Sequence, residues 1–321
     1  MSRLIGAVAS CALVISLAAC ASAPAVCVPS FPAGEGARLV TASGAIGSDP
    51  KADFPTPLVV DATQATTVEA GKGAQVQPGD TAVIQVTLYN AKSGGRIIST
   101  DYTGAGLILG ANAGEPAFGK VAQCATSGSR TAAVGSAGAL LGQAAIDQNK
   151  LPVKPTDTVV MVVDVLERFL GRANGSAQVP QSSLPSIVLA PDGRPGFVIP
   201  KSAPPTELQV AVLQAGEGAE VKKGDTVVLH YTGVLWDSRK VFDSTWERNA
   251  PALLLAESLV DNPKGLVPGF ATALIGQRVG SQVLAVIPPA VGYPTGSAPT
   301  TVPDGSTMVF VFDVLGIAAQ K

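Results

Sequence analysis

The side chains available for chemistry in this sequence do not fit most familiar catalytic arrangements. The single histidine is His230, so any nucleophile activated by a histidine would have to centre on it. The sequence has no GxSxG motif and no CxxC pair of the kind that holds zinc. We interpret His230, which precedes Tyr231 in an alternating segment, as a partly exposed strand residue. Nucleophilic chemistry, a metal and a cofactor are therefore not expected.

A set of aromatic side chains in the second half of the chain remains as the candidate for function. Its members are Tyr231, Trp236, Phe242, Trp246, Phe270, Tyr293, Phe310 and Phe312. Aromatic side chains contribute large areas to the core of a folded domain, so their type alone leaves open whether they line a pocket.

An internal repeat shows which elements must position these residues. GKGAQVQPGDTAVIQVTL at 71–88 returns as GEGAEVKKGDTVVLHYTG at 216–233, and TVVMVVDVL from Thr158 returns as TMVFVFDVL from Thr307. Repetition over this length indicates two copies of one domain. The copies differ because only the second has HYTG and VFDSTW, where the first has QVTL and IISTDY.

Composition supports two β-rich domains. The 321 residues suffice for two domains and a leader, and 35 glycines with 25 prolines are typical of many turns. Charged residues make up only 14% and the formal net charge is -2, which argues against nucleic acid as a partner.

Apolar runs bounded by turn residues predict the strands. In the first copy we expect them at 58–60, 82–88, 130–134 and 158–166, and in the second at 187–191, 196–200, 207–216, 226–236, 282–288 and 307–317. One segment of the second copy, 267–276, has the proline, the i, i+3, i+4 apolar spacing and the final glycine of a helix. Residues 115–125 are its parallel in the first copy, with Phe118 standing where Phe270 stands. We therefore predict an α+β fold in which each copy wraps a curved antiparallel sheet on a short helix.

The N-terminus is typical of an exported lipoprotein. Arg3 precedes an apolar stretch that ends in Leu-Ala-Ala-Cys at Cys20, a tetrad that resembles a bacterial lipobox. A simple secretory signal or a transmembrane helix remains as an alternative, although the stretch is short for a span. We predict a signal peptide at 1–19 and a lipidated Cys20 that anchors the protein to the outer face of the cell membrane.

Two further features concern the organisation of the mature chain. Cys27 and Cys124 are left once the leader and the lipid site are set aside, and in an oxidising compartment we expect them to form a disulfide; two free or buried thiols are the alternative.

We place a tether at 20–35, the first domain at 36–170, a polar linker rich in Gly and Pro at 171–185, and the second domain at 186–321.

The second copy carries a family resemblance. VVLHYTGVLWDSRKVFDST, ERNAP, GLVPGFATALIGQRVGS, VIPPAVGYPTG and VPDGSTMVFVFDVL resemble the successive motifs of FKBP-type peptidyl-prolyl cis-trans isomerases, over about residues 206–318. The resemblance implies a pocket between sheet and helix that acts on proline-containing polypeptides without a cofactor.

The resemblance also implies the role of individual residues. Tyr231 would form a wall of the pocket with its hydroxyl, Phe242 would form the aromatic wall, and Asp243 would be an acidic acceptor with Arg248 beside it. Leu266 and Val267 would belong to the segment whose backbone N–H donates to a substrate carbonyl, and Phe270 would form the floor. Tyr293 would donate its hydroxyl, and Val302 and Phe310 would form the apolar rim. Three positions depart from the family pattern: Phe270 replaces a frequent tryptophan, Ala252 a frequent phenylalanine and Pro294 the usual glycine.

The first copy lacks these groups. We match Tyr231 with Val86, Phe242 with Ile98, Asp243 with Ser99, Tyr293 with Leu141 and Phe310 with Met161. We therefore expect an FKBP-like fold without isomerase activity there, used for spacing, dimerisation or client binding.

The leading hypothesis for the whole chain is an extracytoplasmic isomerase that assists folding of exported proteins. The alternatives are a non-catalytic peptide-binding or chaperone lipoprotein and, more remotely, a structural surface protein.

Overall fold

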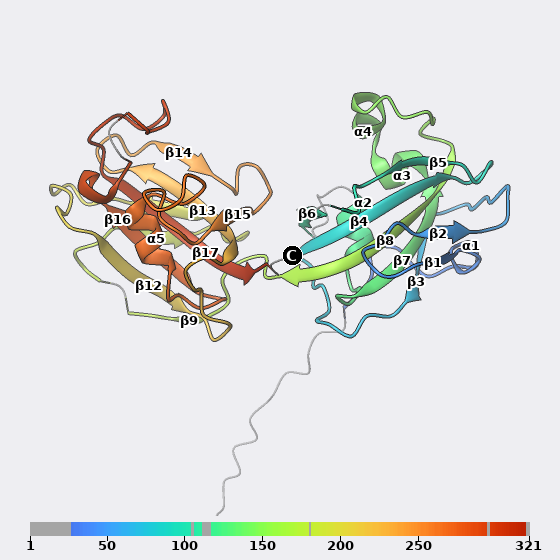
Figure 1. The fold of residues 1–321 in the computed structure, drawn as a ribbon, viewed down its shortest axis with the longest axis horizontal. Helices are drawn as coiled ribbons and strands as arrows, with labels where there is room; N and C mark the ends of the chain where they lie inside the picture. The colour runs from blue at the N-terminus through green and yellow to red at the C-terminus, as the bar shows by residue number, and fades with distance from the viewer. Residues whose placement is uncertain (1–26, 104–105, 111–116, 180, 294–295, 319–321) are drawn as a thin grey trace, which may run out of the picture.

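The computed structural model describes residues 27–103, 106–110, 117–179, 181–293 and 296–318. Two sheet domains lie side by side, the first coloured blue to green and the second yellow to red (Figure 1). The predicted signal peptide, Cys20 and Pro294 lie outside the described residues. Within the described ranges, no helix is both long and apolar enough to cross a membrane.

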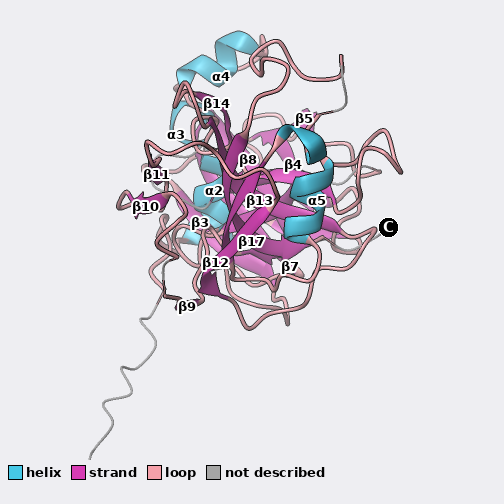
Figure 2. Ribbon diagram, turned by 90° about the vertical axis from the view of Figure 1, so that its left-hand side faces the viewer, coloured by secondary structure: helices cyan, strands magenta, loops and turns pink. Residues whose placement is uncertain are grey.

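The second domain is built on one antiparallel sheet. Its strands follow the order β14 (Val241–Ser244), β13 (Thr226–Leu235), β17 (Met308–Ile317), β16 (Gln282–Ile287), β12 (Gln209–Ala215) and β9 (Ser176–Ala177), and β15 (Ala252–Leu255) also pairs with β13. Helix α5 (Pro268–Leu274) lies against one face of this sheet, where it packs on β16 (Figure 2). Pro268 begins the helix, as its sequence predicts, because its fixed φ suits the first turn and its missing N–H costs no helical hydrogen bond.

The first domain repeats this arrangement. Its sheet has the order β5 (Arg96–Ser99), β4 (Thr81–Asn90), β8 (Thr158–Phe169), β7 (Ser129–Ser136) and β3 (Gln64–Glu69), with β6 (Leu107–Gly110) also on β4. Helix α2 (Ala117–Ala122) corresponds to α5, and α3 (Ala137–Leu141) and α4 (Gln143–Gln148) follow β7. In the second domain the short 3₁₀ helix η1 (Pro289–Val291) follows β16 instead. The α+β class and the duplication are confirmed.

Each sheet is covered on both faces. In the first domain α1 (Glu35–Arg38), β1 (Thr41–Ser43) and β2 (Lys51–Asp53) cover the face away from α2. In the second, the hairpin of β10 (Ser186–Leu189) and β11 (Pro195–Val198) covers the corresponding face and packs Leu184, Ile187 and Phe197 against it. The central strands are therefore buried along almost their whole length.

Two sequence-based expectations differ from the structure. The strand expected at 58–60 is irregular backbone. Leu58 and Val60 pack in the covering layer and Val59 is 73% exposed, so the run packs on the domain without joining a ladder. The described residues of the segment expected to be a linker, 171–179 and 181–185, lie on the second domain. They contribute β9 to the sheet, and the backbone N–H groups of Asn174 and Gly175 both donate to Gly280.

A disulfide joins Cys27 to Cys124. It links the start of the described chain to the residues that follow α2. The N-terminal segment is thereby held on the first domain 97 residues away in sequence.

Each domain has a buried aspartate at the same position of its last strand. In the first, Asp164 pairs with the fully buried Arg130 on β7 and accepts the Gly47 N–H at 2.7 Å. In the second, Asp313 faces Gln282 instead, whose amide donates to it at 2.8 Å, and it also accepts the N–H of Ala173 at 2.8 Å. Burial raises the pKa of Asp313 to about 6. The carboxyl that ties the 171–175 segment to the second domain is therefore held without a directly paired cation.

Asp313→Asn should remove one component of the pH dependence of stability. Because its folded pKa lies above the ordinary 3.8, Asp313 stabilises the fold fully below about pH 4, and this contribution is lost as pH rises through 6. The full difference corresponds to roughly 3 kcal/mol. We expect the unfolding free energy of wild type minus that of the variant to fall by up to this amount between pH 4 and pH 7.

Urea unfolding followed by tryptophan fluorescence measures this difference in the second domain, because both tryptophans, Trp236 and Trp246, belong to it. Taking the difference between the two proteins cancels contributions from all other titrating groups. A difference that stays constant from pH 4 to pH 7 would show that the fold does not raise the pKa of Asp313.

Candidate active site

A pocket lies between the sheet of the second domain and α5. Its volume is about 200 Å³, and it is lined by Tyr231, Phe242, Asp243, Leu254, Leu259, Gly265, Leu266, Val267, Phe270, Tyr293 and Phe310. The register of β13 on β17 places Tyr231 opposite Phe312 and Gly233 opposite Phe310, so the aromatic residues of two neighbouring strands meet below the helix. The structure therefore brings together eight of the ten pocket residues that the resemblance implies.

Four aromatic rings pack edge to face around the base of the pocket. The ring of Phe310 lies 4.9 Å from Phe270 and 5.4 Å from Phe242, both nearly perpendicular. Tyr231 meets Phe270 at 6.2 Å, and Phe312 stacks behind Phe270 at 4.7 Å. Phe270 and Phe310 are only 3% and 5% exposed. Edge-to-face packing fixes the rings relative to one another, so the base is a rigid apolar surface.

A polar network closes one side of the pocket. The Tyr231 hydroxyl donates to Asp243 at 2.5 Å, and Arg248 forms an ion pair with the other oxygen of the same carboxylate. A guanidinium nitrogen of Arg248 also lies 3.5 Å from the Tyr231 hydroxyl. Burial, together with the hydrogen bond to Asp243, raises the pKa of Tyr231 to about 12. Tyr231 is therefore protonated at neutral pH, and its proton is already committed to Asp243.

Two hydrogen-bond donors at the pocket have no acceptor among the described residues. One is the hydroxyl of Tyr293, whose pKa is raised by burial and by the negative charge of Asp243. The other is the backbone N–H of Val267, just before α5. The neighbouring N–H of Leu266 donates to Glu257 at 2.7 Å. Of the two backbone positions implied by the resemblance, only Val267 is thus available to a ligand.

The remaining implied residues lie at the edge. Val302 is buried beside a second cavity of about 200 Å³, and Tyr293 lines both cavities. Arg248 contacts the pocket only through Asp243 and Tyr231. Sequence reasoning missed Leu254, Leu259 and Gly265, which belong to β15 and to the loop before α5. Its residue type is the one feature of Gly265 visible in the sequence. The structure explains it, because a Cβ there would lie 2.6 Å from the Glu257 carbonyl oxygen and only glycine fits.

His230 is not the partly exposed residue that its sequence indicates. It is 8% exposed and stacks on Trp246 at 4.2 Å, and its Nδ1 is hydrogen-bonded to Thr245. Burial lowers its pKa to about 4, so it is neutral at physiological pH. Among the described residues, no group of three or more His, Cys, Asp or Glu side chains could hold a metal.

Strand pairing corrects two of the matches between copies. Asp243 pairs with Gly233, and the corresponding pair in the first domain is Ile98 with Leu88. Ile98 therefore corresponds to Asp243, and Ile97 to Phe242. The predicted matches were one residue out because they aligned VFDSTW with IISTDY, whereas the offset that relates 71–88 to 216–233 continues unchanged through this hairpin. Val86 for Tyr231 and Met161 for Phe310 agree with the strand register.

Comparison with known proteins gives the family. Residues 217–315 match the description "FKBP-type peptidyl-prolyl cis-trans isomerase". FK506-binding protein 2B of Rhizopus delemar is 34% identical over 122 residues, which cover 37% of this chain and 56% of that protein. The probable FK506-binding protein of Corynebacterium glutamicum is 31% identical over 123 residues, which cover 38% of this chain and 97% of that protein.

A third relative is longer than the matched region. The FKBP-type peptidyl-prolyl cis-trans isomerase FkpA of Escherichia coli K12 is 32% identical over 112 residues, which cover 35% of this chain and 38% of that protein. The chain thus spans about half or less of the Rhizopus and Escherichia relatives but nearly all of the Corynebacterium protein. Together with the pocket between sheet and helix, these matches show that the chain belongs to the FKBP-type peptidyl-prolyl cis-trans isomerase family.

Proposed function

We propose that the second domain catalyses cis–trans isomerisation of X-Pro bonds in polypeptides. Rotation about such a bond crosses a barrier of roughly 18–20 kcal/mol, because twisting removes the amide resonance. The twisted state needs no acid, base or nucleophile. It is favoured by an apolar surface that suits the less polar twisted amide and by donors that hold the carbonyl in place. The observation that carries the proposal is a rigid aromatic base with two donors at its edge that bond to no described residue.

In this proposal the proline ring rests on Phe270 between Phe242 and Phe310. The hydroxyl of Tyr293 and the N–H of Val267 donate to substrate carbonyls. Asp243 is held by Tyr231 and Arg248, so the carboxylate shapes the rim while its charge is balanced. The smaller Phe270 in place of a tryptophan leaves the floor aromatic and buried.

The first domain supports placing the activity in the second copy only. A Cβ on Gly233 would lie 2.5 Å from the ring of Phe242 and 2.8 Å from that of Phe310, so glycine makes the space in which these rings meet. The matching residue of the first domain is Leu88, which is fully buried and fills that space with its own side chain. A leucine and two rings cannot occupy one volume at native packing density. At this position the first domain therefore has a packed leucine where the second has two aromatic rings of the pocket.

Loss of a donor or of the rim carboxylate should lower the isomerisation rate. We expect Tyr293→Phe and Asp243→Ala each to reduce kcat/KM about tenfold in the full chain, because one ligand hydrogen bond or the fixed position of Tyr231 is lost. The rate is measured with a proline-containing tetrapeptide. Val86→Ala, at the position of Tyr231 in the first domain, is the matched control and should leave the rate unchanged. Wild-type protein without activity above background would instead favour a non-catalytic peptide-binding protein.

Replacing Gly233 tests the reason for the division between domains. Gly233→Leu should lower kcat/KM for the tetrapeptide at least tenfold, because the new side chain displaces Phe242 and Phe310. Gly233→Ala, which adds only the Cβ, should show a smaller loss and covers the case in which the leucine variant does not fold. Leu88→Gly in the first domain should not change the rate. Full activity of Gly233→Ala and Gly233→Leu would refute the role of this glycine.

We further propose that the protein works outside the cytoplasm, anchored by a lipidated Cys20 to the cell membrane, and assists the folding of exported proteins. The lipobox-like tetrad and the disulfide of Cys27 with Cys124 support this location, because structural disulfides persist in oxidising compartments. Each methylene of the acyl chains would add roughly 0.8 kcal/mol to membrane attachment.

Cys20→Ser should move the protein from the membrane fraction to the soluble fraction of cells that export it. Cys11→Ser, within the same apolar stretch, is the matched control and should remain in the membrane fraction. Fractionation and incorporation of a labelled fatty acid measure the two outcomes. Membrane attachment that survives Cys20→Ser would rule out the lipid anchor at this residue.

A further inference from the structure

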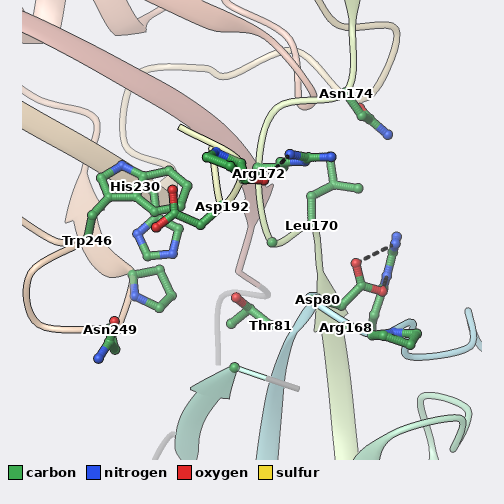
Figure 3. A pocket seen from close by; sticks show the side chains of 16 residues that line it. Asp80, Thr81, Arg168, Leu170, Arg172, Asn174, Asp192, His230, Trp246 and Asn249 are labelled. Atoms are coloured by element: carbon green, nitrogen blue, oxygen red, sulfur yellow. Dashed lines mark hydrogen bonds and ion pairs between the residues drawn. The ribbon is translucent and has the colours of Figure 1, made fainter. Parts of the chain in front are cut away.

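A cavity of about 540 Å³ lies between the two domains, away from the aromatic pocket. Successive strand residues point to opposite faces of a sheet. Tyr231 faces the pocket, so its neighbour His230 faces the cavity on the other side of β13. Figure 3 shows Trp246 and His230 of the second domain on one side and Thr81, Asp80 and Arg168 of the first on the other. The volume is within the range of ligand sites, which occur preferentially at domain interfaces.

Close packing where the two domains meet fixes the two walls of the cavity relative to one another. The ring of Phe169, at the end of β8, covers Gly316 so closely that a Cβ there would lie 2.1 Å from the ring. The N–H of Leu170 donates to Leu315 at 3.2 Å. Phe169 and Leu315 also form a buried cluster with residues of both sheets. The cavity is therefore preformed and needs no domain closure to exist.

Aromatic rings form the wall of the cavity on the second domain. Trp246 is half-buried and stacks on His230, with the ring planes 23° apart. Thr245 fixes the pair, because its hydroxyl is hydrogen-bonded both to His230 Nδ1 and to the N–H of Tyr231. A neutral, fixed indole face of this kind suits the ring of a proline or of an aromatic side chain.

The polar groups of the cavity carry both signs of charge. Arg168 holds Asp80 through two hydrogen bonds of 2.6 and 3.0 Å, so this pair is neutral as a unit. Arg172 donates one hydrogen bond to a backbone carbonyl, and Asp192 accepts one from a backbone N–H. The Thr81 hydroxyl faces the same space (Figure 3). Donors and acceptors around a neutral aromatic face complement a polypeptide, whose backbone alternates N–H and C=O, better than they complement an anion or a cation.

One short turn connects the cavity to the aromatic pocket. Residues 245–250 join β14 to β15; Trp246 of this turn lines the cavity, while Arg248 pairs with Asp243 at the pocket. One turn therefore contributes a residue to each site, although the two sites lie on opposite faces of β13. A polypeptide has to pass around this turn to reach from the pocket to the cavity.

We propose that the cavity between the domains is a second binding site for the polypeptide whose prolyl bond occupies the pocket, with an apolar ring of that polypeptide on Trp246. The proposal rests on the proposed isomerase function. It gives the first domain a function that needs no pocket of its own, because Thr81 and the Asp80–Arg168 pair form one wall of the site.

Substrates of different length separate the two sites. A proline-containing tetrapeptide is long enough only for the pocket, whereas a permanently unfolded, proline-containing protein reaches both. Trp246→Ala should lower kcat/KM at least fivefold for the unfolded protein and less than twofold for the tetrapeptide. Thr81→Val, on the opposite wall, should cause a smaller loss for the unfolded protein alone. Glu247→Ala, an exposed neighbour that does not line the cavity, is the matched control. Equal losses for both substrates, or no loss for the unfolded protein, would overturn the proposal.

Direct binding distinguishes failure of this site from failure of the catalytic proposal. The anisotropy of the fluorescently labelled unfolded protein gives its Kd for the full chain whether or not the chain is active on the tetrapeptide. A Kd at least fivefold weaker for Trp246→Ala than for Glu247→Ala supports the second site. Equal Kd values for these variants would contradict it, even if the tetrapeptide is isomerised normally.

Discussion

The space above Gly233 is the constraint on which the arrangement of the second domain depends. The pairing of β13 with β17 places this glycine opposite Phe310, and the missing side chain lets Phe310 and Phe242 meet edge to face. In the first domain Leu88 takes the same place opposite Met161 and fills the core. The two domains have the same strand order, apart from β9, which only the second has. One position of the central strand thus holds a packed leucine in the first domain and, in the second, a glycine that lets two rings of the pocket meet.

Burial of both faces of the sheet gives the second domain two distinct surfaces. Tyr231 and His230 are neighbours on β13, yet the first contacts the aromatic pocket and the second the cavity between the domains. Thr245 is hydrogen-bonded to both residues. The 245–250 turn that begins with it also carries Arg248, whose guanidinium pairs with Asp243. The polar network of the pocket is therefore built on the same turn that forms the aromatic wall of the cavity.

Sequence patterns predicted those parts of the structure whose cause is local. Helix α5 follows from its proline and apolar spacing, and the GDT and DVL residues shared by the copies have structural roles. Asp80 and Asp225 accept backbone N–H groups in equivalent turns, and Asp164 and Asp313 tie preceding segments to each sheet. The aromatic lining was implied only by resemblance to a family.

The parts that could not be predicted depend on tertiary contacts. The covering layers, the burial of His230 under Trp246 and the packing of 171–179 on the second domain all arise from contacts between residues distant in sequence. The mismatch of Ile98 with Phe242 is an exception, because the offset that relates 71–88 to 216–233 already matches Phe242 with Ile97, and the strand pairing agrees. The cavity at the joint needs both domains, and neither copy alone indicates it.

Exchange spectroscopy of a proline-containing peptide tests the central claim most directly, because it reports isomerisation and contact in one experiment. With the full chain at a small fraction of the peptide concentration, we expect cis–trans exchange cross-peaks that are absent from the peptide alone. We also expect the peptide to shift the resonances of Phe270 and Tyr293 and to leave those of Leu88 and Met161 unchanged. No enhanced exchange, or shifts confined to the first domain, would contradict the account.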